Sequence, residues 1–283
     1  MNTSQLFLIT NHTNLHVGAG NSSQGVIDNL VQRDHVNSLP AIYSSSLKGA
    51  LREFFTEGPD KATLSTKVVD VFGSKPSGPE LIKGKYVFHD GILLSYPVRS
   101  NKKPFFNATA PMVFKRLLEN IDLLNFSLDD KLMIKLKAFM IMAITKGCPT
   151  VFSTACQNLK IEEFSTFHFQ SDTSLEFNVI KTIFGDNLVM FNDEDFMALT
   201  DDYSLPVIAR NQLENGQSNN LFYEQVVPRE TRFYFFATKY DSTIDLATCI
   251  NSKKVQLGAN GSIGYGLCSI KQFPSSQTNQ TQS

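Results

Sequence analysis

Short apolar runs and helical stripes follow one another along the chain without a fixed repeat. The run SQLFLIT (4–10) is short and apolar, which is typical of a strand. In SSSLKGALREFF (44–55) the apolar residues fall on one helical face, and a serine can cap the first turn. TRFYFFATKY (231–240) is rich in aromatic and β-branched residues and is the clearest strand. The other predicted elements are helices at 62–72, 111–124, 128–144 and 242–250, a strand or hairpin at 84–94, and strands at 253–258 and 267–272.

This order of elements predicts an α+β fold, because strands and helices occur in mixed groups rather than in strict alternation. No linker divides the chain, so we predict one domain over residues 1–273 with inserted loops. Residues 274–283 are a polar tail that we predict to be disordered. Residues 11–40 are predicted to be a long polar, glycine-rich connection, and loops of that length are usually functional or disordered.

Composition narrows the possible functions. A hydrophobic content of 42% in 283 residues is enough to build a substantial core. The 26 basic and 27 acidic residues nearly balance, which excludes a bulk basic field, so any site for a polyanion has to be local. The four cysteines lack C-x-x-C spacing, which excludes a zinc ribbon. Without a signal peptide or a membrane-length apolar run, we expect a soluble cytoplasmic protein.

The segment GANGSIGYG (258–266) holds four of the 16 glycines. It lacks the G-K-[ST] of a P-loop and the spacing of G-x-G-x-x-G, which excludes both nucleotide-binding motifs. Two interpretations stay open. The segment can be a hairpin turn with several positive φ angles, or a loop whose bare amides lie against a phosphate chain.

The predicted helix SSSLKGALR offers a second possible anion site. Lys48 and Arg52 are four residues apart and therefore share one helical face. Three serines precede them at the helix start, where free amides favour an anion. This arrangement suits a phosphodiester backbone, although an ordinary solvated basic face has the same pattern.

Candidate catalytic groups lie on the early loop LHVGAGNSSQGVIDNLVQRDH (15–35). His16 and Asp28 supply an imidazole and a carboxylate, which can act as acid and base or bind a metal in phosphodiester chemistry. The alternative is a polar contact for His16 and a turn-capping role for Asp28. In LFYEQVVPRETRF (221–233), Glu224 taken alone is predicted to be exposed at the start of a strand.

Taken together and in order, several segments resemble the RAMP superfamily, and within it the repeated backbone subunit of the type III-B (Cmr) CRISPR effector complex. They are LHVGAG, GVIDNLVQRD, LPAIYSSSLKGALR, GKYVFHDGILLSYPVRS, NLFYEQVVPRETRFYF and VQLGANGSIGYGLCSI, covering about residues 5–272. SSLKGALR and the last glycine loop indicate only the superfamily. GVIDNLVQRD and LFYEQVVPRETRF narrow the resemblance to the type III-B subunit.

The resemblance implies a modified ferredoxin-like (RRM-like) palm with a protruding thumb hairpin and lid insertions. It implies partners as well: the guide RNA (crRNA), the target RNA, other Cmr subunits, and further copies of the chain stacked as a filament. Each thumb would displace a base pair of the guide–target duplex. The target RNA would be cut beside that position in a reaction that needs a divalent metal, Mg²⁺ or Mn²⁺.

The resemblance also assigns residues. Asp28 corresponds to the family's essential aspartate and would be catalytic and metal-binding, and His16 and Glu224 correspond to two further candidate catalytic residues. The family often has Trp-Tyr-Glu-Glu where this chain reads Phe222-Tyr223-Glu224-Gln225, so the second carboxylate is missing. The predicted guide-binding residues are Ser46, Lys48, Arg52, Gly258, Asn260, Gly261, Gly264 and Gly266.

These observations leave three hypotheses about the function of the protein. The leading hypothesis is an RNA-guided endoribonuclease subunit, which the GVID context of Asp28 favours. The second is a structural RNA-binding subunit that does not cut, in which Asp28 is only a loop residue. The third, an unrelated small-molecule enzyme, has no cofactor motif in its favour.

Overall fold

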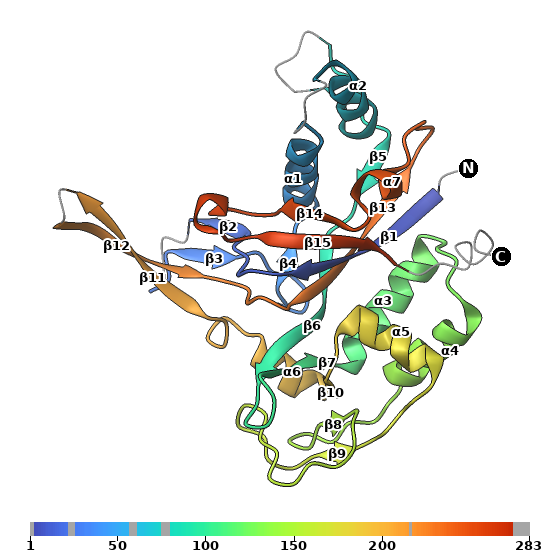
Figure 1. Ribbon diagram of the computed structural model, residues 1–283, viewed down its shortest axis with the longest axis vertical. Coiled ribbons are helices and arrows are strands. Elements are labelled where there is room, and N and C mark those ends of the chain that lie inside the picture. Colours follow the sequence, from blue (N-terminus) through green and yellow to red (C-terminus); the bar gives the residue numbers. More distant parts are fainter. Residues whose placement is uncertain (1–2, 22–25, 57–60, 75–79, 215–216, 274–283) are drawn as a thin grey trace.

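Four antiparallel strands form the centre of the computed structural model, which describes residues 3–273 except 22–25, 57–60, 75–79 and 215–216 (Figure 1). They are β1 (Thr3–Asn11), β6 (Gly91–Arg99), β13 (Arg232–Lys239) and β15 (Leu267–Gln272). Their order in the sheet is β15-β1-β13-β6. Helix α1 (Ser44–Thr56) connects the first to the second, and α7 (Leu246–Ile250) lies between the third and the fourth. This β-α-β-β-α-β arrangement confirms the predicted α+β, ferredoxin-like palm.

The palm strands are apolar because both faces of the sheet are covered. Leu6, Phe7 and Ile9 of β1 are completely buried, and the Phe7 ring stacks on Phe235 of β13 at 5.1 Å. One face also receives α3 (Pro111–Leu123), whose Asn120 Nδ2 donates to the Tyr234 hydroxyl at 2.9 Å. A strand buried on two faces reads as a continuous apolar run. That explains why β1 and β13 were easy to predict.

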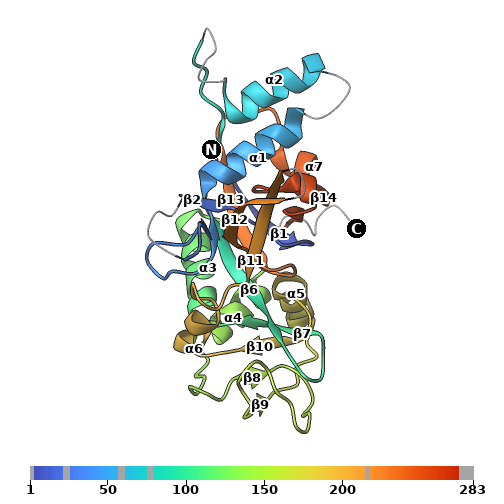
Figure 2. The same ribbon diagram turned by 90° about the vertical axis from the view of Figure 1, so that its left-hand side faces the viewer.

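Smaller elements extend the palm. The edge strand β14 (Lys253–Gln256) pairs with β15, while β4 (Ala41–Ile42) pairs with β6 and β5 (Tyr86–Phe88) with β13. Helix α2 (Lys61–Phe72) packs against α1 at the upper end of the molecule (Figure 2).

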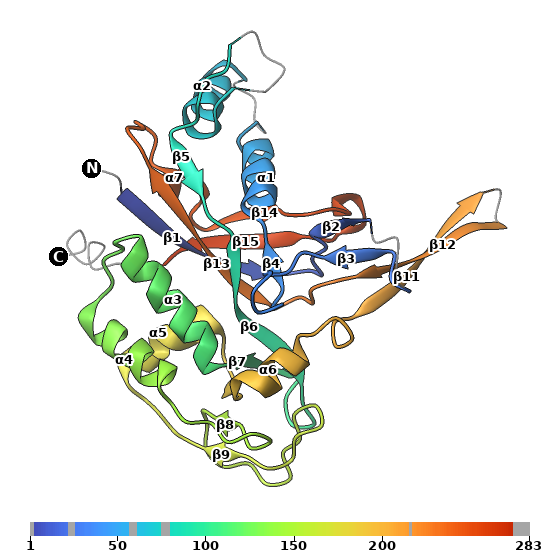
Figure 3. The ribbon, with the colours of Figure 1, turned by 180° about the vertical axis from the view of Figure 1, so that it is seen from behind.

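Strand β6 continues beyond the palm and pairs there with β7, which begins a large insertion between β6 and the thumb (Figure 3). The insertion contains β7 (Phe105–Thr109), α3, α4 (Asp130–Met140), β8 (Thr150–Val151), β9 (His168–Phe169), α5 (Leu175–Phe184), β10 (Leu188–Met190) and α6 (Asp193–Leu199). The helix predicted at 128–144 is shorter than expected. It starts after Asp129, whose carboxylate caps it, and ends at Met140.

A second sheet protrudes from the palm. Its longest strands, β11 (Val207–Glu214) and β12 (Gln217–Gln225), form an antiparallel hairpin that extends to the left in Figure 1. This hairpin is the predicted thumb. Two strands from the early part of the chain, β3 (Asn29–Val31) and β2 (Gly18–Asn21), complete the sheet in the order β11-β12-β3-β2. The expectation of a connection without strands at 11–40 was therefore wrong.

No described helix has both the length and the apolar composition needed to cross a bilayer. The predicted tail at 274–283 lies outside the described residues. The single-domain organisation stays a prediction.

Candidate functional site

A buried polar network lies at the base of the thumb. Its centre is the Glu224 carboxylate on β12, which is only 3% exposed, so the prediction of an exposed glutamate was wrong. Glu224 Oε2 accepts hydrogen bonds from Asn260 Nδ2 at 2.8 Å and from Arg210 Nη1 at 3.2 Å. Arg210 Nη1 also donates to Asn260 Oδ1 at 2.8 Å. The network thus joins both thumb strands to the last glycine loop, residues 258–266.

His16 completes this network from the first glycine loop, residues 15–20. Its Nε2 atom lies 3.7 Å from Glu224 Oε1, and the residue is 5% exposed. Its Nδ1 atom is 2.7 Å from the carbonyl oxygen of Gln225. Because a carbonyl oxygen only accepts, Nδ1 is the nitrogen that carries the proton in this bond. The ring lies over Gly18, where a Cβ would come within 3.1 Å of Nε2.

Asp28 lies outside the buried network, directly before β3, the strand that pairs with β12 beside Glu224. Its Oδ2 accepts from the Tyr223 N–H at 2.7 Å, and its own N–H donates to the Tyr223 carbonyl at 3.1 Å. The next residue, Asn29, is paired with Glu224 in the ladder between β3 and β12. Asp28 is exposed, and within the described residues Oδ1 has no hydrogen-bond partner. The structure therefore places an accessible carboxylate in a fixed position beside the thumb.

The last glycine loop is held against the first one through its backbone. Ala259 N–H donates to the His16 carbonyl at 2.8 Å, and a Cβ at Gly258 (φ +71°) would lie 2.3 Å from that oxygen. A Cβ at Gly266 (φ +71°) would lie 1.9 Å from the Leu257 oxygen. Only glycine combines positive φ with such close approach. Gly261 and Gly264 are exposed, so the loop presents backbone outward while its two ends are packed.

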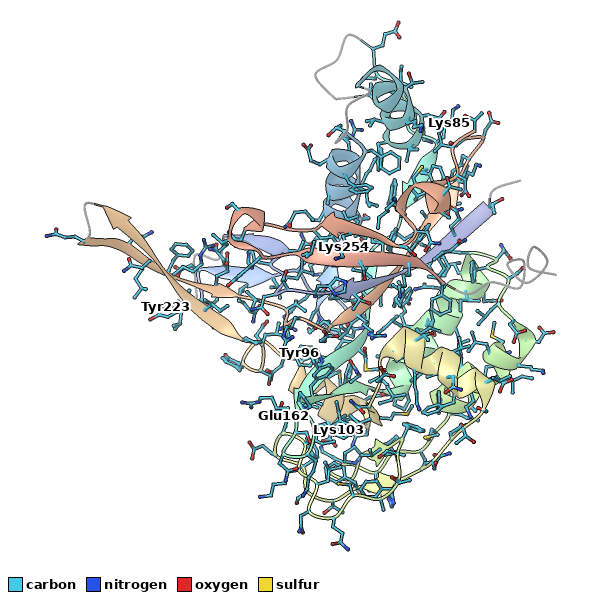
Figure 4. All side chains as sticks on the ribbon, viewed as in Figure 1. Lys85, Tyr96, Lys103, Glu162, Tyr223 and Lys254 are labelled. Atoms are coloured by element: carbon cyan, nitrogen blue, oxygen red, sulfur yellow. The ribbon has the colours of Figure 1, made fainter. Side chains whose placement is uncertain are left out.

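A cavity of about 440 Å³ lies beside this loop, between the first glycine loop, α1 and β14. It is lined by Val17, Gly18, Ser46, Ala50, Glu53, Phe54, Lys254, Gln256 and Gly258. The Ser46 hydroxyl accepts from Gln32 Nε2 at 3.0 Å, which fixes the start of α1 beside β2. Lys254, labelled in Figure 4, is the cation of this lining. Lys254 is not among the predicted guide-binding residues, although the adjacent lysines Lys253 and Lys254 precede the glycine loop.

Of the two cations predicted on α1, Arg52 contacts the end of α2. Arg52 Nη2 donates to the carbonyls of Phe72 at 2.9 Å and Gly73 at 3.0 Å, and its guanidinium lies 5.9 Å from the Phe72 ring centre. Burial, followed by the nearby Arg52 charge, lowers the pKa of the Lys48 ammonium. Neither side chain lines the cavity at the glycine loop. Their contact with RNA stays a prediction.

The side chains available as ligands decide whether this site can bind a metal ion. Across the part of the chain that the structure describes, no three His, Cys, Asp or Glu side chains are grouped to hold an ion. Asp28 offers one exposed carboxylate. Mg²⁺ commonly binds through one or two carboxylates together with substrate phosphates and water, so Asp28 fits a metal shared with RNA rather than a protein cage.

Comparison with known proteins identifies the family. Residues 8–269 match the RAMP superfamily. The chain belongs to this superfamily. This RAMP protein is 28% identical to the CRISPR system Cmr endoribonuclease Cmr4 of Pyrococcus furiosus, over 91% of its own length and 92% of the relative. It is 34% identical to the CRISPR system CMR subunit Cmr4 of Saccharolobus solfataricus over 94 residues, which are 33% of this chain and 29% of the relative.

Solved structures agree with the RAMP fold. A chain of the type III-B Cmr-beta complex bound to cognate target RNA superposes with a TM-score of 0.77 at 24% identity, covering 95% of this chain and 97% of the other. Oligomeric Cmr4 from Pyrococcus furiosus superposes with a TM-score of 0.65 at 21% identity, covering 96% of this chain and 99% of the other. The resemblance to the type III-B backbone subunit is confirmed.

Proposed function

We propose that this RAMP protein is a backbone subunit of a type III-B CRISPR effector complex, and that it binds guide RNA and cuts complementary target RNA. The observation that carries the proposal is Asp28, an exposed carboxylate fixed by the Tyr223 N–H at the base of the thumb. The Pyrococcus relative named an endoribonuclease supports the activity. Association with further copies of the chain is supported by the relative whose crystal structure is described as oligomeric, and stacking of these copies along one guide RNA is part of the proposal.

RNA carries its own nucleophile, and this limits what the protein has to supply. The Asp28 carboxylate takes the proton of a target 2′-hydroxyl, and the 2′-oxygen then forms a bond to the adjacent phosphorus. The bond from phosphorus to the 5′-oxygen breaks, and that oxygen receives a proton from water. The products are a 2′,3′-cyclic phosphate and a 5′-hydroxyl. Alternatively, Asp28 would hold a divalent ion together with the RNA, and that ion would neutralise charge on the scissile phosphate.

The guide RNA lies, on this proposal, along the face formed by the cavity beside α1 and the last glycine loop. Backbone amides, the Ser46 helix start and Lys254 follow a phosphate chain without reading its sequence. Base pairing with the guide then supplies the specificity, as in other RNA-guided systems. This division of labour agrees with the nearly neutral net charge of −1. The cytoplasmic location expected from the sequence stays a prediction.

The decisive test is the substitution Asp28→Asn, which keeps an oxygen for the Tyr223 N–H but removes the charge and the base. We expect target binding to stay within about twofold and cleavage of a complementary RNA to fall by about 10³-fold or more. The assay uses the complex assembled with guide RNA and Mg²⁺, with EDTA as the metal-free arm, and analyses the product ends.

Asp34→Asn is the matched control, because the Asp34 Oδ1 also accepts backbone N–H groups, from Val36 at 2.7 Å and Asn37 at 3.3 Å. It should cut at the unsubstituted rate. An Asp28→Asn complex that cuts normally would leave the non-cleaving structural subunit as the better interpretation. Undiminished cleavage in EDTA would remove the metal from the proposal.

A further inference from the structure

The buried network connects two surfaces that the proposed function uses separately. Asn260 stands inside the last glycine loop, on the side assigned to the guide RNA. Glu224 stands on β12 directly after Tyr223, the residue whose N–H holds Asp28. Arg210, from β11, donates to both Glu224 and Asn260. One carboxylate therefore fixes the glycine loop, the thumb and the strand beside Asp28.

Burial argues against a direct chemical role for Glu224. The residue is 3% exposed, Oε2 already accepts two hydrogen bonds, and Oε1 faces the His16 ring. An RNA phosphate would have to displace these partners to reach it. Removing the carboxylate would instead leave the half-buried Arg210 guanidinium and the Asn260 side-chain amide without the Glu224 acceptor. Removing one partner from a buried network in this way is costly in stability.

Asn260 gives independent evidence that the network shapes the loop. Its backbone is left-handed (φ 66°, ψ 25°), a conformation that few residues other than glycine adopt. Both atoms of its side-chain amide are bonded inside the network, the Nδ2 to Glu224 and the Oδ1 to Arg210. The side chain thus secures the turn that leads into the exposed glycines.

We propose that Glu224, Arg210 and Asn260 are positioning residues, which set the shape of the guide-facing loop and the place of Asp28 together. His16 supports the same network from the first glycine loop. The RNA readouts of this inference rest on the proposed function, whereas the network itself can be tested without RNA. A catalytic glutamate and a positioning glutamate predict opposite results for two substitutions.

Glu224→Ala removes every acceptor, whereas Glu224→Gln keeps one oxygen for Arg210 and Asn260 and places an amide group beside the His16 ring. We expect Glu224→Ala to weaken guide-RNA binding by about tenfold and to slow single-turnover cleavage at saturating guide by about tenfold. Glu224→Gln should keep both within about threefold. Asn260→Gly, which retains the left-handed backbone and loses only the side chain, should weaken guide binding like Glu224→Ala.

The matched control is Glu162→Ala, which breaks the ion pair between Arg99 at the end of β6 and Glu162 in the large insertion (Nη2 to Oε2, 2.7 Å), outside the Glu224 network (Figure 4). It should change neither guide-RNA binding nor cleavage.

A double-mutant cycle tests the network without RNA. The effects of Arg210→Ala and Glu224→Ala on the free energy of unfolding in urea should be strongly non-additive. Additive effects of the two substitutions on unfolding would overturn the inference. So would a Glu224→Ala variant that binds guide RNA with unchanged affinity. Loss of cleavage in Glu224→Gln at full affinity would make Glu224 catalytic. An unsubstituted complex that does not cut target RNA would refute the proposed function. The unfolding cycle would still show whether Arg210 and Glu224 are energetically coupled.

Discussion

The last glycine loop allows two glycine-to-alanine substitutions that differ in one physical respect. Gly258 and Gly264 both have positive φ, +71° and +83°. A Cβ at Gly264 meets no atom within 4 Å, whereas a Cβ at Gly258 would lie 2.3 Å from the His16 carbonyl oxygen. Gly264→Ala therefore introduces only the backbone cost, and Gly258→Ala adds a collision with another segment.

The magnitudes follow from these contacts. Alanine in the left-handed region costs about 1–2 kcal/mol, which is the expected loss for Gly264→Ala. At Gly258 the loop has to move away from His16, so the hydrogen bond from Ala259 N–H is lost at a cost of about 1 kcal/mol. Displacing packed backbone adds about 1–3 kcal/mol. We expect Gly258→Ala to lower the free energy of unfolding by about 3–6 kcal/mol.

Urea unfolding of both variants, followed by circular dichroism, measures this difference directly. Guide-RNA binding by the folded variants is the second readout, and it should be weaker for Gly258→Ala than for Gly264→Ala. Equal losses of stability in the two variants would refute the reasoning, because the close approach to His16 would then contribute nothing.

Three further predictions concern other regions. Lys254→Ala should weaken guide binding and reduce the slope of log affinity against log salt by about one, as fluorescence anisotropy can show. In the same prediction, Arg52→Ala should lower stability in urea unfolding, because the Arg52 guanidinium donates to the Phe72 carbonyl. Burial raises the pKa of the Asp70 carboxyl, but hydrogen bonds from Lys85 and Ser242 outweigh it and hold that pKa below its usual value. Its stabilisation is present above the unfolded pKa and lost as pH falls, so Asp70→Asn should flatten the loss of Tm between about pH 5 and 3. Burial raises the pKa of the Cys268 thiol to about 12, so Cys268 should stay unmodified by a thiol reagent at pH 8 while the half-buried cysteines react.

The elements that could be predicted are those whose signal is local. The strand expected at 231–240 is β13 (Arg232–Lys239), and the helix expected at 44–55 is α1. The helix at 128–144 was overextended because its sequence is apolar nearly all round. In the structure Ile134 is 68% and Ile141 is 76% exposed, so hydrophobicity did not mark where burial ends. Helix α5 was missed although Ser174 caps it, with Oγ accepting from the Phe177 N–H.

Features that depend on distant partners could not be predicted from local sequence. Strands β2 and β3 exist because the thumb strand β12 lies beside them, almost 200 residues later in the chain: the Tyr223 N–H reaches Asp28 across a separation of 195. Glu224 is buried because His16 and Asn260 reach it from opposite ends of the sequence. Its correspondence to a candidate catalytic residue came from family resemblance, and the contacts that indicate a positioning role appear only in three dimensions.

The pairing of β1 has a consequence for how the protein is made. The strand is synthesised long before both of its neighbours in the sheet: Thr10 pairs with Arg232, and Asn11 with Cys268. At about 5–20 residues per second, β1 waits on the order of 10–45 s for its first partner. Throughout that time the run Leu6–Ile9, which ends fully buried, has no sheet to enter. The sheet of the palm can therefore be completed only after the insertion and the thumb have been synthesised, because the strands on both sides of β1 follow them in the chain.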